Sequence, residues 1–186
     1  RTLVTDTFTR TDTTGPLGTA DSGQAWETIA GTAFGITSNA AYNTDTANTL
    51  CISTIDSATC NGRVACTVTR TTQVAGLVVR LTDASNYWYV SLSGSATTLN
   101  KMVAGSPTTV ATSASTFSGA TAVEVVMSGS NFTVLVNNAV LLTGTDSFNA
   151  TATKHGIMRQ QTLNNSRHDN FTVKQARSEE HTSELQ

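Results

Sequence analysis

Glutamate and lysine are scarce in this chain of 186 residues. Residues 1–176 contain two glutamates, Glu27 and Glu124, and three lysines. Both residue types favour helices, whereas threonine, which makes up about a fifth of the chain, favours strands and turns together with the many valines and serines. The composition therefore predicts an all-β protein without long helices.

Charge of one sign and long apolar runs are also missing. The formal net charge is −2, and the last ten residues hold one of the 11 basic and three of the 13 acidic side chains, so ten of each remain in residues 1–176. A neutral body without a basic stripe argues against nucleic acid or an anionic membrane as a partner. No apolar run approaches the roughly 18 residues that a membrane span needs.

The cysteine pattern argues against a zinc site. Cys51, Cys60 and Cys66 show no C-x-x-C spacing and no histidine cluster accompanies them. Two alternatives remain open. Cys51 and Cys60 form a disulfide that closes a surface loop in an oxidising compartment, or all three are free thiols with Cys66 buried in a strand.

Catalytic motifs are absent as well, so no catalytic residue is assigned. Hydrolysis of a glycosidic bond usually uses two carboxylates that face one sugar, and no two acids of residues 1–176 form a close pair on one strand. There is no G-x-S-x-G motif before a helix and no glycine-rich phosphate loop. The chain is therefore predicted not to be an enzyme.

What is present is a clear β-hairpin in residues 75–93, around which the chain is organised. Two apolar runs flank the turn-forming segment Asp83–Asn86. Placing Thr82 opposite Tyr87 segregates the side chains into two faces. The apolar face, predicted to be buried, has Leu77, Val79, Leu81, Trp88, Val90 and Leu92. The open face has Val78, Arg80, Thr82, Tyr87, Tyr89 and Ser91.

Further short strands are predicted on both sides of this hairpin. Val64, Cys66 and Val68 share one face of a strand. Asn137 and Asn138 tolerate positive φ and predict a two-residue turn. This turn would align Phe132, Val134 and Val136 with Ala139, Leu141 and Thr143. About twelve strands with frequent turns predict a two-sheet antiparallel jelly-roll sandwich, as a single domain over residues 1–176.

The last ten residues, 177–186, are set apart from this domain. Their sequence RSEEHTSELQ is what translation of a common sequencing adapter yields, so we expect a non-native, disordered tail of a metagenomic sequence. The chain also begins with Arg1 instead of methionine, which suggests a module of a longer protein.

Several short motifs, in this order, resemble one family over nearly all of residues 4–174. They are Asp6-Thr-Phe-Thr-Arg10, Leu17-Gly18, Trp26 with Gly31–Ile36, Gly76–Arg80 with Asp83–Tyr87, Val136–Asn138 and Asp169–Val173. Together they resemble the concanavalin A-like, laminin G-like jelly rolls, which occur as modules of bacterial extracellular proteins and phage tail proteins. Laminarinase-like glycosidases of this fold carry an E-x-D-x-(x)-E strand, which this sequence lacks because Glu27 and Glu124 are too far apart to form it.

The resemblance implies a curved sheet that binds carbohydrate, a calcium ion at the rim in some members, and neighbouring terminal strands around Phe8 and Phe171. If those strands pair, Asp12 and Asp169 are candidate calcium ligands. The alternative is that Asp12 is a turn residue and Asp169 an ordinary strand-end residue. No other cofactor is expected.

Ligand binding is predicted on the open face of the hairpin. Arg80, Tyr87 and Tyr89 are the candidate binding residues, because an aromatic ring stacks on a sugar while a guanidinium donates to hydroxyls. Lys101 is added as a neighbour of Tyr89 on the next strand, in a register that is ambiguous by one residue. The alternative is a cation–π pair that only covers the sheet.

The sequence thus predicts a non-catalytic carbohydrate-binding or adhesion module of a larger extracellular or phage tail protein, placed outside the cell or on the virion surface. Its expected partner is a glycan or cell-surface polysaccharide, besides other domains or copies of the chain. The alternatives are a structural spacer or oligomerisation module without ligand and, more remotely, a glycosidase.

Overall fold

The computed structural model describes residues 1–47, 49–72, 74–160 and 166–176, which form fifteen strands in two antiparallel sheets. No helix long and apolar enough to cross a membrane occurs in these ranges. In chain order the strands are β1 (Thr2–Asp6), β2 (Glu27–Ala30), β3 (Phe34–Thr37), β4 (Ala40–Asn43), β5 (Cys51–Asp56), β6 (Gly62–Arg70), β7 (Val74–Asp83), β8 (Asn86–Leu92), β9 (Thr97–Val103), β10 (Ser106–Ser113), β11 (Gly119–Ser128), β12 (Asn131–Val136), β13 (Ala139–Thr145), β14 (Lys154–Gln160) and β15 (Arg167–Gln175).

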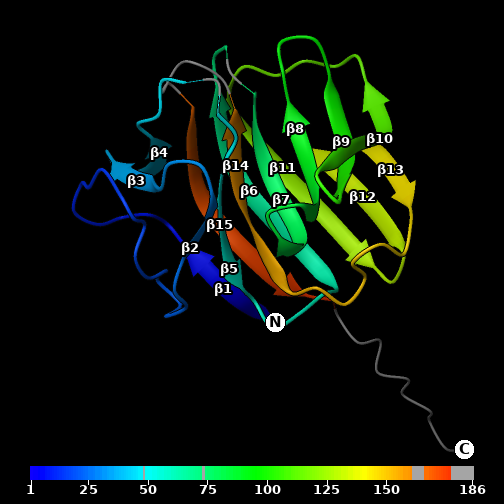
Figure 1. Cartoon of the computed structure of the whole chain (residues 1–186), viewed down its shortest axis with the longest axis horizontal. Coiled ribbons are helices and arrows are strands. Elements are labelled where there is room, and N and C mark those ends of the chain that lie inside the picture. The colour runs from blue at the N-terminus through cyan, green and yellow to red at the C-terminus, as the bar shows by residue number, and fades with distance from the viewer. Residues whose placement is uncertain (48, 73, 161–165, 177–186) are drawn as a thin grey trace, which may run out of the picture.

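The two sheets stack as the layers of a sandwich (Figure 1). The eight-stranded sheet has the order β13-β12-β11-β6-β15-β4-β3, with β1 paired to β15 beside this path. The seven-stranded sheet has the order β10-β9-β8-β7-β14-β5-β2. The predicted all-β, two-sheet antiparallel sandwich is confirmed, although it has more strands than the twelve expected. Below, the inner face of a sheet is the one that faces the other sheet.

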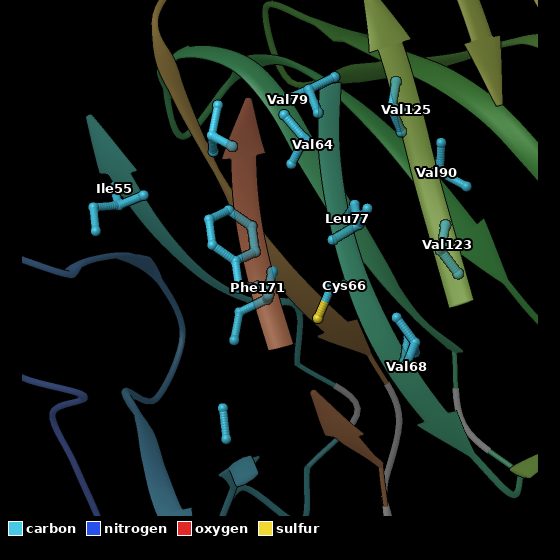
Figure 2. Close-up of a cluster of buried hydrophobic side chains, with 14 of the residues drawn as sticks. Ile55, Val64, Cys66, Val68, Leu77, Val79, Val90, Val123, Val125 and Phe171 are labelled. Atoms are coloured by element: carbon cyan, nitrogen blue, oxygen red, sulfur yellow. The ribbon is translucent and has the colours of Figure 1, made fainter. Parts of the chain in front are cut away.

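The core lies between the two inner faces, where strands alternate buried apolar and more exposed side chains. Figure 2 shows side chains from both sheets meeting there. The seven-stranded sheet contributes Ile55, Leu77, Val79 and Val90, and the eight-stranded sheet Val64, Cys66, Val68, Val123, Val125 and Phe171. The predicted shared face of Val64, Cys66 and Val68 is confirmed.

The two ends of the described chain meet, as the resemblance implied. β1 pairs with β15, with Asp6 opposite Phe171, and Phe8 lies two residues beyond β1. The buried Asp6 carboxylate accepts hydrogen bonds from the backbone N–H of Phe8 at 2.9 Å and from the indole of Trp26 at 2.7 Å. It also accepts two from the Arg10 guanidinium, at 2.7 and 3.0 Å. The Trp26 ring lies 5.8 Å from that of Phe8 and 5.0 Å from that of Phe171, so motifs from both ends of the sequence form one cluster.

The central hairpin has its predicted apolar face but a different register. Val79 pairs with Trp88 and Leu77 with Val90, two residues away from the predicted pairs. A shift by two keeps every side chain on its face. Leu77, Val79, Trp88, Val90 and Leu92 are therefore buried in the core as predicted.

A bulge near the turn of this hairpin reverses two predicted positions. Asp83 pairs with Asn86, so the loop holds two residues instead of four. The irregularity lies between the pair Val79/Trp88 and this turn, and there Arg80 adopts a φ of 49°. As a result Arg80 is fully buried, whereas Leu81 joins an apolar cluster separate from the core. The prediction was wrong for Arg80 and for the face of Leu81, which is buried as predicted, because a bulge breaks the two-residue period of side chains along a strand.

The Asn137–Asn138 turn is confirmed. Both residues have positive φ, 50° and 65°, and Val136 pairs with Ala139 across the two-residue loop. A second bulge follows in β13, so that Leu142 pairs with Val134 and is buried. Leu141 is partly buried against the core, on its predicted face, whereas Thr143 is exposed and pairs with Thr133, so its predicted alignment was wrong.

The structure decides between the two cysteine alternatives. Cys51 begins β5 and Cys60 lies beyond its far end, roughly 16 Å along the strand, whereas a disulfide needs Cα atoms within about 7 Å. All three cysteines are free, and Cys66 is buried. The predicted non-native tail, residues 177–186, lies outside the described residues.

Candidate functional site

The outer face of the seven-stranded sheet carries an apolar cluster of its own. Its buried members are Ile52, Val78, Leu81, Tyr87 and Met158, from strands β5, β7, β8 and β14. Partly buried side chains, including Tyr89 and Met102, pack against this cluster. The middle of this face is thus an apolar floor, with Tyr89 and Met102 at its margin.

Two tyrosines of β8 lie on this face, Tyr87 within the floor and Tyr89 at its margin. Tyr87 is only 1% exposed, whereas Tyr89 is half-buried, and their ring centroids lie 5.7 Å apart. Burial raises the pKa of Tyr87 to about 12 and also raises the pKa of Tyr89. Both phenols are therefore neutral at physiological pH, and the Tyr89 ring offers an uncharged platform to a ligand.

A polar strip runs beside Tyr89 across three neighbouring strands, β8, β9 and β10, which lie side by side in Figure 1. The Thr109 hydroxyl donates to Asn100 Oδ1 at 2.8 Å, and Asn100 Nδ2 donates to Thr98 Oγ1 at 2.7 Å. Thr98 and Ser91 share a hydrogen bond of 2.7 Å. The register places Asn100 directly opposite Tyr89 and Thr98 opposite Ser91.

The polar strip has hydrogen-bond donors that lack an acceptor. The Asn100 amide has two N–H donors, of which one donates to Thr98. The hydroxyls of Thr98 and Ser91 form one hydrogen bond with each other, which uses only one of their two hydrogen atoms. Among the described residues, one amide N–H and one hydroxyl of the strip thus have no acceptor. We call Tyr89, Ser91, Thr98, Asn100 and Thr109 the Tyr89 face.

Arg80 does not belong to this face, contrary to the prediction. Its guanidinium lies inside the sandwich, 4.8 Å from the centre of the Phe132 ring. Nε donates to the carbonyl of Cys60 at 3.0 Å. Nη2 donates to Asn61 Oδ1 at 3.1 Å and to the carbonyl of Gly129 at 2.7 Å. Burial lowers the pKa of Arg80, and its guanidinium joins two loops, the one containing Cys60 and Asn61 and the turn at Gly129.

Tyr87 and Lys101 were also predicted to be exposed beside Tyr89, and neither is. Tyr87 lies on the outer face but is buried in the floor. Lys101 pairs with Trp88, and its ammonium lies 6.0 Å from the Trp88 ring and forms an ion pair with Asp146. Lys101 therefore lies on the inner side of the sheet, and the placement next to Tyr89 was wrong. Of the four candidates, only Tyr89 is accessible on the outer face, and whether it binds a ligand stays a prediction.

The residues predicted to bind calcium do not fit that ion. Asp12 accepts a hydrogen bond from the backbone N–H of Ser38 and lies next to Thr13, which bridges to Ile36 of β3. β3 and β4 then separate it from Asp169 on β15, roughly 14 Å away at the usual strand spacing. Calcium needs its oxygen ligands at about 2.4 Å, so the two carboxylates cannot share one ion. No group of three or more potential metal ligands gathers among the described residues.

The two glutamates lie on opposite outer faces of the sandwich. Glu27 of β2 forms an ion pair with Lys154 on the seven-stranded sheet. Glu124 of β11 forms an ion pair with Arg63 on the eight-stranded sheet. They are therefore unable to face one sugar together.

Several aspartates are also unsuited to act as a general acid. A glycosidase acid needs a raised pKa, so that it is protonated when the sugar arrives. In this chain hydrogen bonds lower the pKa of the aspartates for which a shift is found. These are Asp21, Asp45, Asp56, Asp83 and Asp146.

The prediction missed the polar strip, although a signal for it exists. The turn between β8 and β9 is closed by Ser93, whose hydroxyl accepts hydrogen bonds from the backbone of Ser95 and Ala96. Serine favours such turns. Recognising it would have paired Leu92 with Thr97 and thereby placed Asn100, instead of Lys101, beside Tyr89.

No protein-family model matches the sequence, and no curated protein matches it. Solved structures do match the fold. The carbohydrate binding module CBM66 from Bacillus subtilis aligns with a TM-score of 0.63 at 12% identity, over 80% of this chain and 94% of that chain. The Bacillus licheniformis beta-glucanase aligns with a TM-score of 0.62 at 10% identity, over 93% of this chain and 97% of that chain.

A third match is GH43B of the Bacteroides ovatus xyloglucan PUL, with a TM-score of 0.67 at 17% identity over 93% of this chain and 39% of that protein. A binding module and a glucanase thus share this architecture, so the fold alone does not decide between binding and catalysis. The two curved antiparallel sheets identify the chain as a concanavalin A-like jelly-roll sandwich.

Proposed function

We propose that the chain is a non-catalytic carbohydrate-binding module whose ligand lies on the Tyr89 face. The observation that carries the proposal is that the half-buried Tyr89 ring lies beside a polar strip whose donors include some without an acceptor. A pyranose has the complementary chemistry, because one of its faces is lined by C–H groups and its rim by hydroxyls. The C–H face stacks on Tyr89, and the hydroxyls accept hydrogen bonds from Asn100 and the neighbouring hydroxyls.

The composition of the face favours a neutral glycan. None of its five members carries a charge, and the nearby cations Arg80 and Lys101 are held on the inner side of the sheet. Binding should therefore depend little on salt, because no ion pair with the ligand is screened. The likeness in shape to a carbohydrate binding module supports this proposal.

The non-catalytic part of the proposal rests on the carboxylates. Glu27 and Glu124 occupy opposite outer faces and each is held in an ion pair. The Tyr89 face itself contains no carboxylate, so a sugar bound there has neither a nucleophile nor an acid in reach.

The proposal includes a place outside the cell or on a virion surface, as an adhesion module of a larger protein. Polysaccharides are accessible there, and a single shallow site of this size binds weakly. Several copies on one fibre or one cell surface would raise the apparent affinity by avidity. A spacer or oligomerisation module without ligand is the alternative that the following experiment separates.

The test is a glycan array of neutral polysaccharides and oligosaccharides, probed with the 186-residue chain and with Tyr89→Ala. We expect Tyr89→Ala to weaken binding of an array hit by about tenfold or more, the equivalent of about 1.4 kcal/mol for a lost stacking contact. The matched control is Tyr42→Ala, which removes a half-buried tyrosine from β4 of the other sheet. Equal binding by both variants, or no array hit at all, would favour the spacer.

A further inference from the structure

A hollow of about 140 Å³ lies on the outer face of the eight-stranded sheet, on the opposite side of the molecule from the Tyr89 face. This volume lies below the roughly 300–1,000 Å³ of sites that enclose drug-sized ligands, so the hollow has room for one small unit only. Ala122 lies in its floor, and we call it the Ala122 hollow. The side chains that form it are Ala65 and Thr67 of β6, Ala122 and Glu124 of β11, Leu135 of β12, and Asn138 and Asn170.

The hollow exists because small side chains occupy the middle of this face. Thr67 pairs with Ala122, and the next outward residue of β6 is Ala65, so three small side chains lie together on two adjacent strands. Larger side chains stand around them, among them Leu135 on β12 and Asn170 at a bulge of β15. A ligand would therefore sit on an apolar floor between raised walls.

The walls carry hydrogen-bonding groups that nothing else uses. Within the described part of the chain, the side-chain amides of Asn138 and Asn170 and the hydroxyl of Thr67 make no hydrogen bond. Asn138 and Asn170 are exposed, so they reach a ligand without a change of the backbone. Each amide offers two donors and one acceptor, which is the mixture that a vicinal diol requires.

The charge of the hollow is balanced. Glu124 is its only ionisable side chain besides the buried thiol of Cys66, and Glu124 pairs with Arg63. An anionic ligand would meet a carboxylate, and a cationic ligand would compete with Arg63. A neutral ligand avoids both penalties.

We propose that the Ala122 hollow is a second binding site, for one unit of a neutral sugar. The apolar floor of Ala65 and Ala122, with Leu135 beside it, receives a C–H face, and the amides of Asn138 and Asn170 bind the hydroxyls. This inference does not depend on the Tyr89 face, because the two sites lie on different sheets. If both sites bind, the module joins two glycan chains, one on each side of the sandwich.

The test follows the side-chain amide signals of Asn138 and Asn170 by nuclear magnetic resonance in the ¹⁵N-labelled 186-residue chain. The probes are methyl β-glucoside, methyl β-galactoside, methyl α-mannoside and N-acetylglucosamine, each at up to about 50 mM, which covers millimolar affinities. We expect at least one probe to shift both signals in a saturable manner. If none of the four probes does so, the proposal is wrong.

A filling variant and its matched control locate the site. Ala122→Leu places a larger side chain in the hollow and should abolish the saturable shifts. Ala120→Leu makes the same change two residues earlier on the same exposed face of β11, outside the hollow, and should leave them intact. Shifts that survive Ala122→Leu would overturn the assignment.

Tyr89→Ala distinguishes this inference from the proposed function. It should leave the shifts of Asn138 and Asn170 unchanged, because Tyr89 lies on the other sheet. Loss of array binding with retained shifts, or the reverse, shows which of the two sites has failed. Loss of the shifts in a folded Tyr89→Ala variant would contradict two independent sites.

Discussion

Asp6 shows how much structure a single buried carboxylate can organise. It is fully buried at the end of β1 and accepts hydrogen bonds from Phe8, Arg10 and Trp26, which lie up to 20 residues away. Arg10 is 25% exposed and supplies the compensating positive charge. The carboxylate thus orients the loop that follows β1 and fixes the Trp26 ring between Phe8 and Phe171.

We expect Asp6→Asn to lower the free energy of unfolding by about 3 kcal/mol, because it removes the negative charge from a buried, hydrogen-bonded ion pair. For a chain of this size the corresponding fall in Tm is about 5–10 °C. Urea unfolding followed by tryptophan fluorescence measures the change. Asp12→Asn is the control, since Asp12 is exposed and its change should cost less than about 1 kcal/mol. Similar effects of the two variants would mean that the Asp6 cluster does not stabilise the fold.

At the scale of the element, the bulge of β7 determines which residues lie on the outer face of the seven-stranded sheet. It turns Arg80 inward, where the guanidinium joins the loop containing Cys60 and Asn61 to the turn at Gly129. The backbone N–H of Arg80 also donates to His155 Nδ1 at 3.0 Å. The bulge thereby connects β7 to three other parts of the chain.

Arg80→Met should lower the free energy of unfolding by roughly 2–4 kcal/mol, because the apolar stem remains while buried carbonyl groups lose their donors. Chemical denaturation compared with Arg63→Met measures the specific part. Arg63 is exposed and forms a surface ion pair, so its change should cost at most about 1 kcal/mol. A stable Arg80→Met variant that still binds glycan would show that the buried guanidinium is dispensable. Loss of glycan binding in a fully stable Arg80→Met variant would instead indicate that Arg80 contacts the ligand.

The same bulge marks the limit of what could be predicted from the sequence. Alternation of apolar residues correctly placed Leu77, Val79 and Trp88, because a shift of two residues does not change the face. The inward turn of Arg80 has no sequence signal, since a charged residue is normally expected at the surface. Of the predicted binding residues, only Tyr89 is therefore accessible on the outer face. The residues that lie beside it could not be predicted, because their positions depend on how the strands pair.

At the scale of the whole molecule, two histidines tie the structure together. His168 of the eight-stranded sheet lies within 3.2 Å of the carbonyl of Gly76 in the seven-stranded sheet. His155 lies 2.9 Å from the carbonyl of Thr59. Both rings are fully buried, and burial lowers the pKa of each to about 4.

Stability should therefore fall as the pH decreases from about 6.5 to about 4. In this range the unfolded chain binds protons on both histidines while the folded chain does not, so protonation favours unfolding. Each histidine contributes a loss of roughly 3 kcal/mol at the acid end of the range. The aspartates with lowered pKa values, such as Asp21 and Asp56, lose their contribution only at lower pH, below their ordinary value of 3.8.

Urea unfolding at several pH values between 7.5 and 4.5 measures this dependence. His168→Gln keeps a donor near Gly76 but does not titrate, so its stability should fall about half as steeply as that of the parent. A parent whose stability is constant over this range, or an unchanged slope in His168→Gln, would contradict the prediction.

The pairing of β1 with β15 also determines how the molecule responds to tension. Thr2 pairs with Lys174, and the backbone N–H of Gln175 donates to the carbonyl of Arg1 at 2.9 Å, so both ends of the described chain emerge side by side at one end of the sandwich (Figure 1). A force that pulls these ends apart acts across the strands and opens their hydrogen bonds one after another, as a zipper does, instead of shearing all of them at once. Peeling begins at Arg1 and reaches the Asp6 cluster last. A module held in this way should yield gradually at its ends, while the Tyr89 face, built on strands of the other sheet, remains folded until the Asp6 cluster opens.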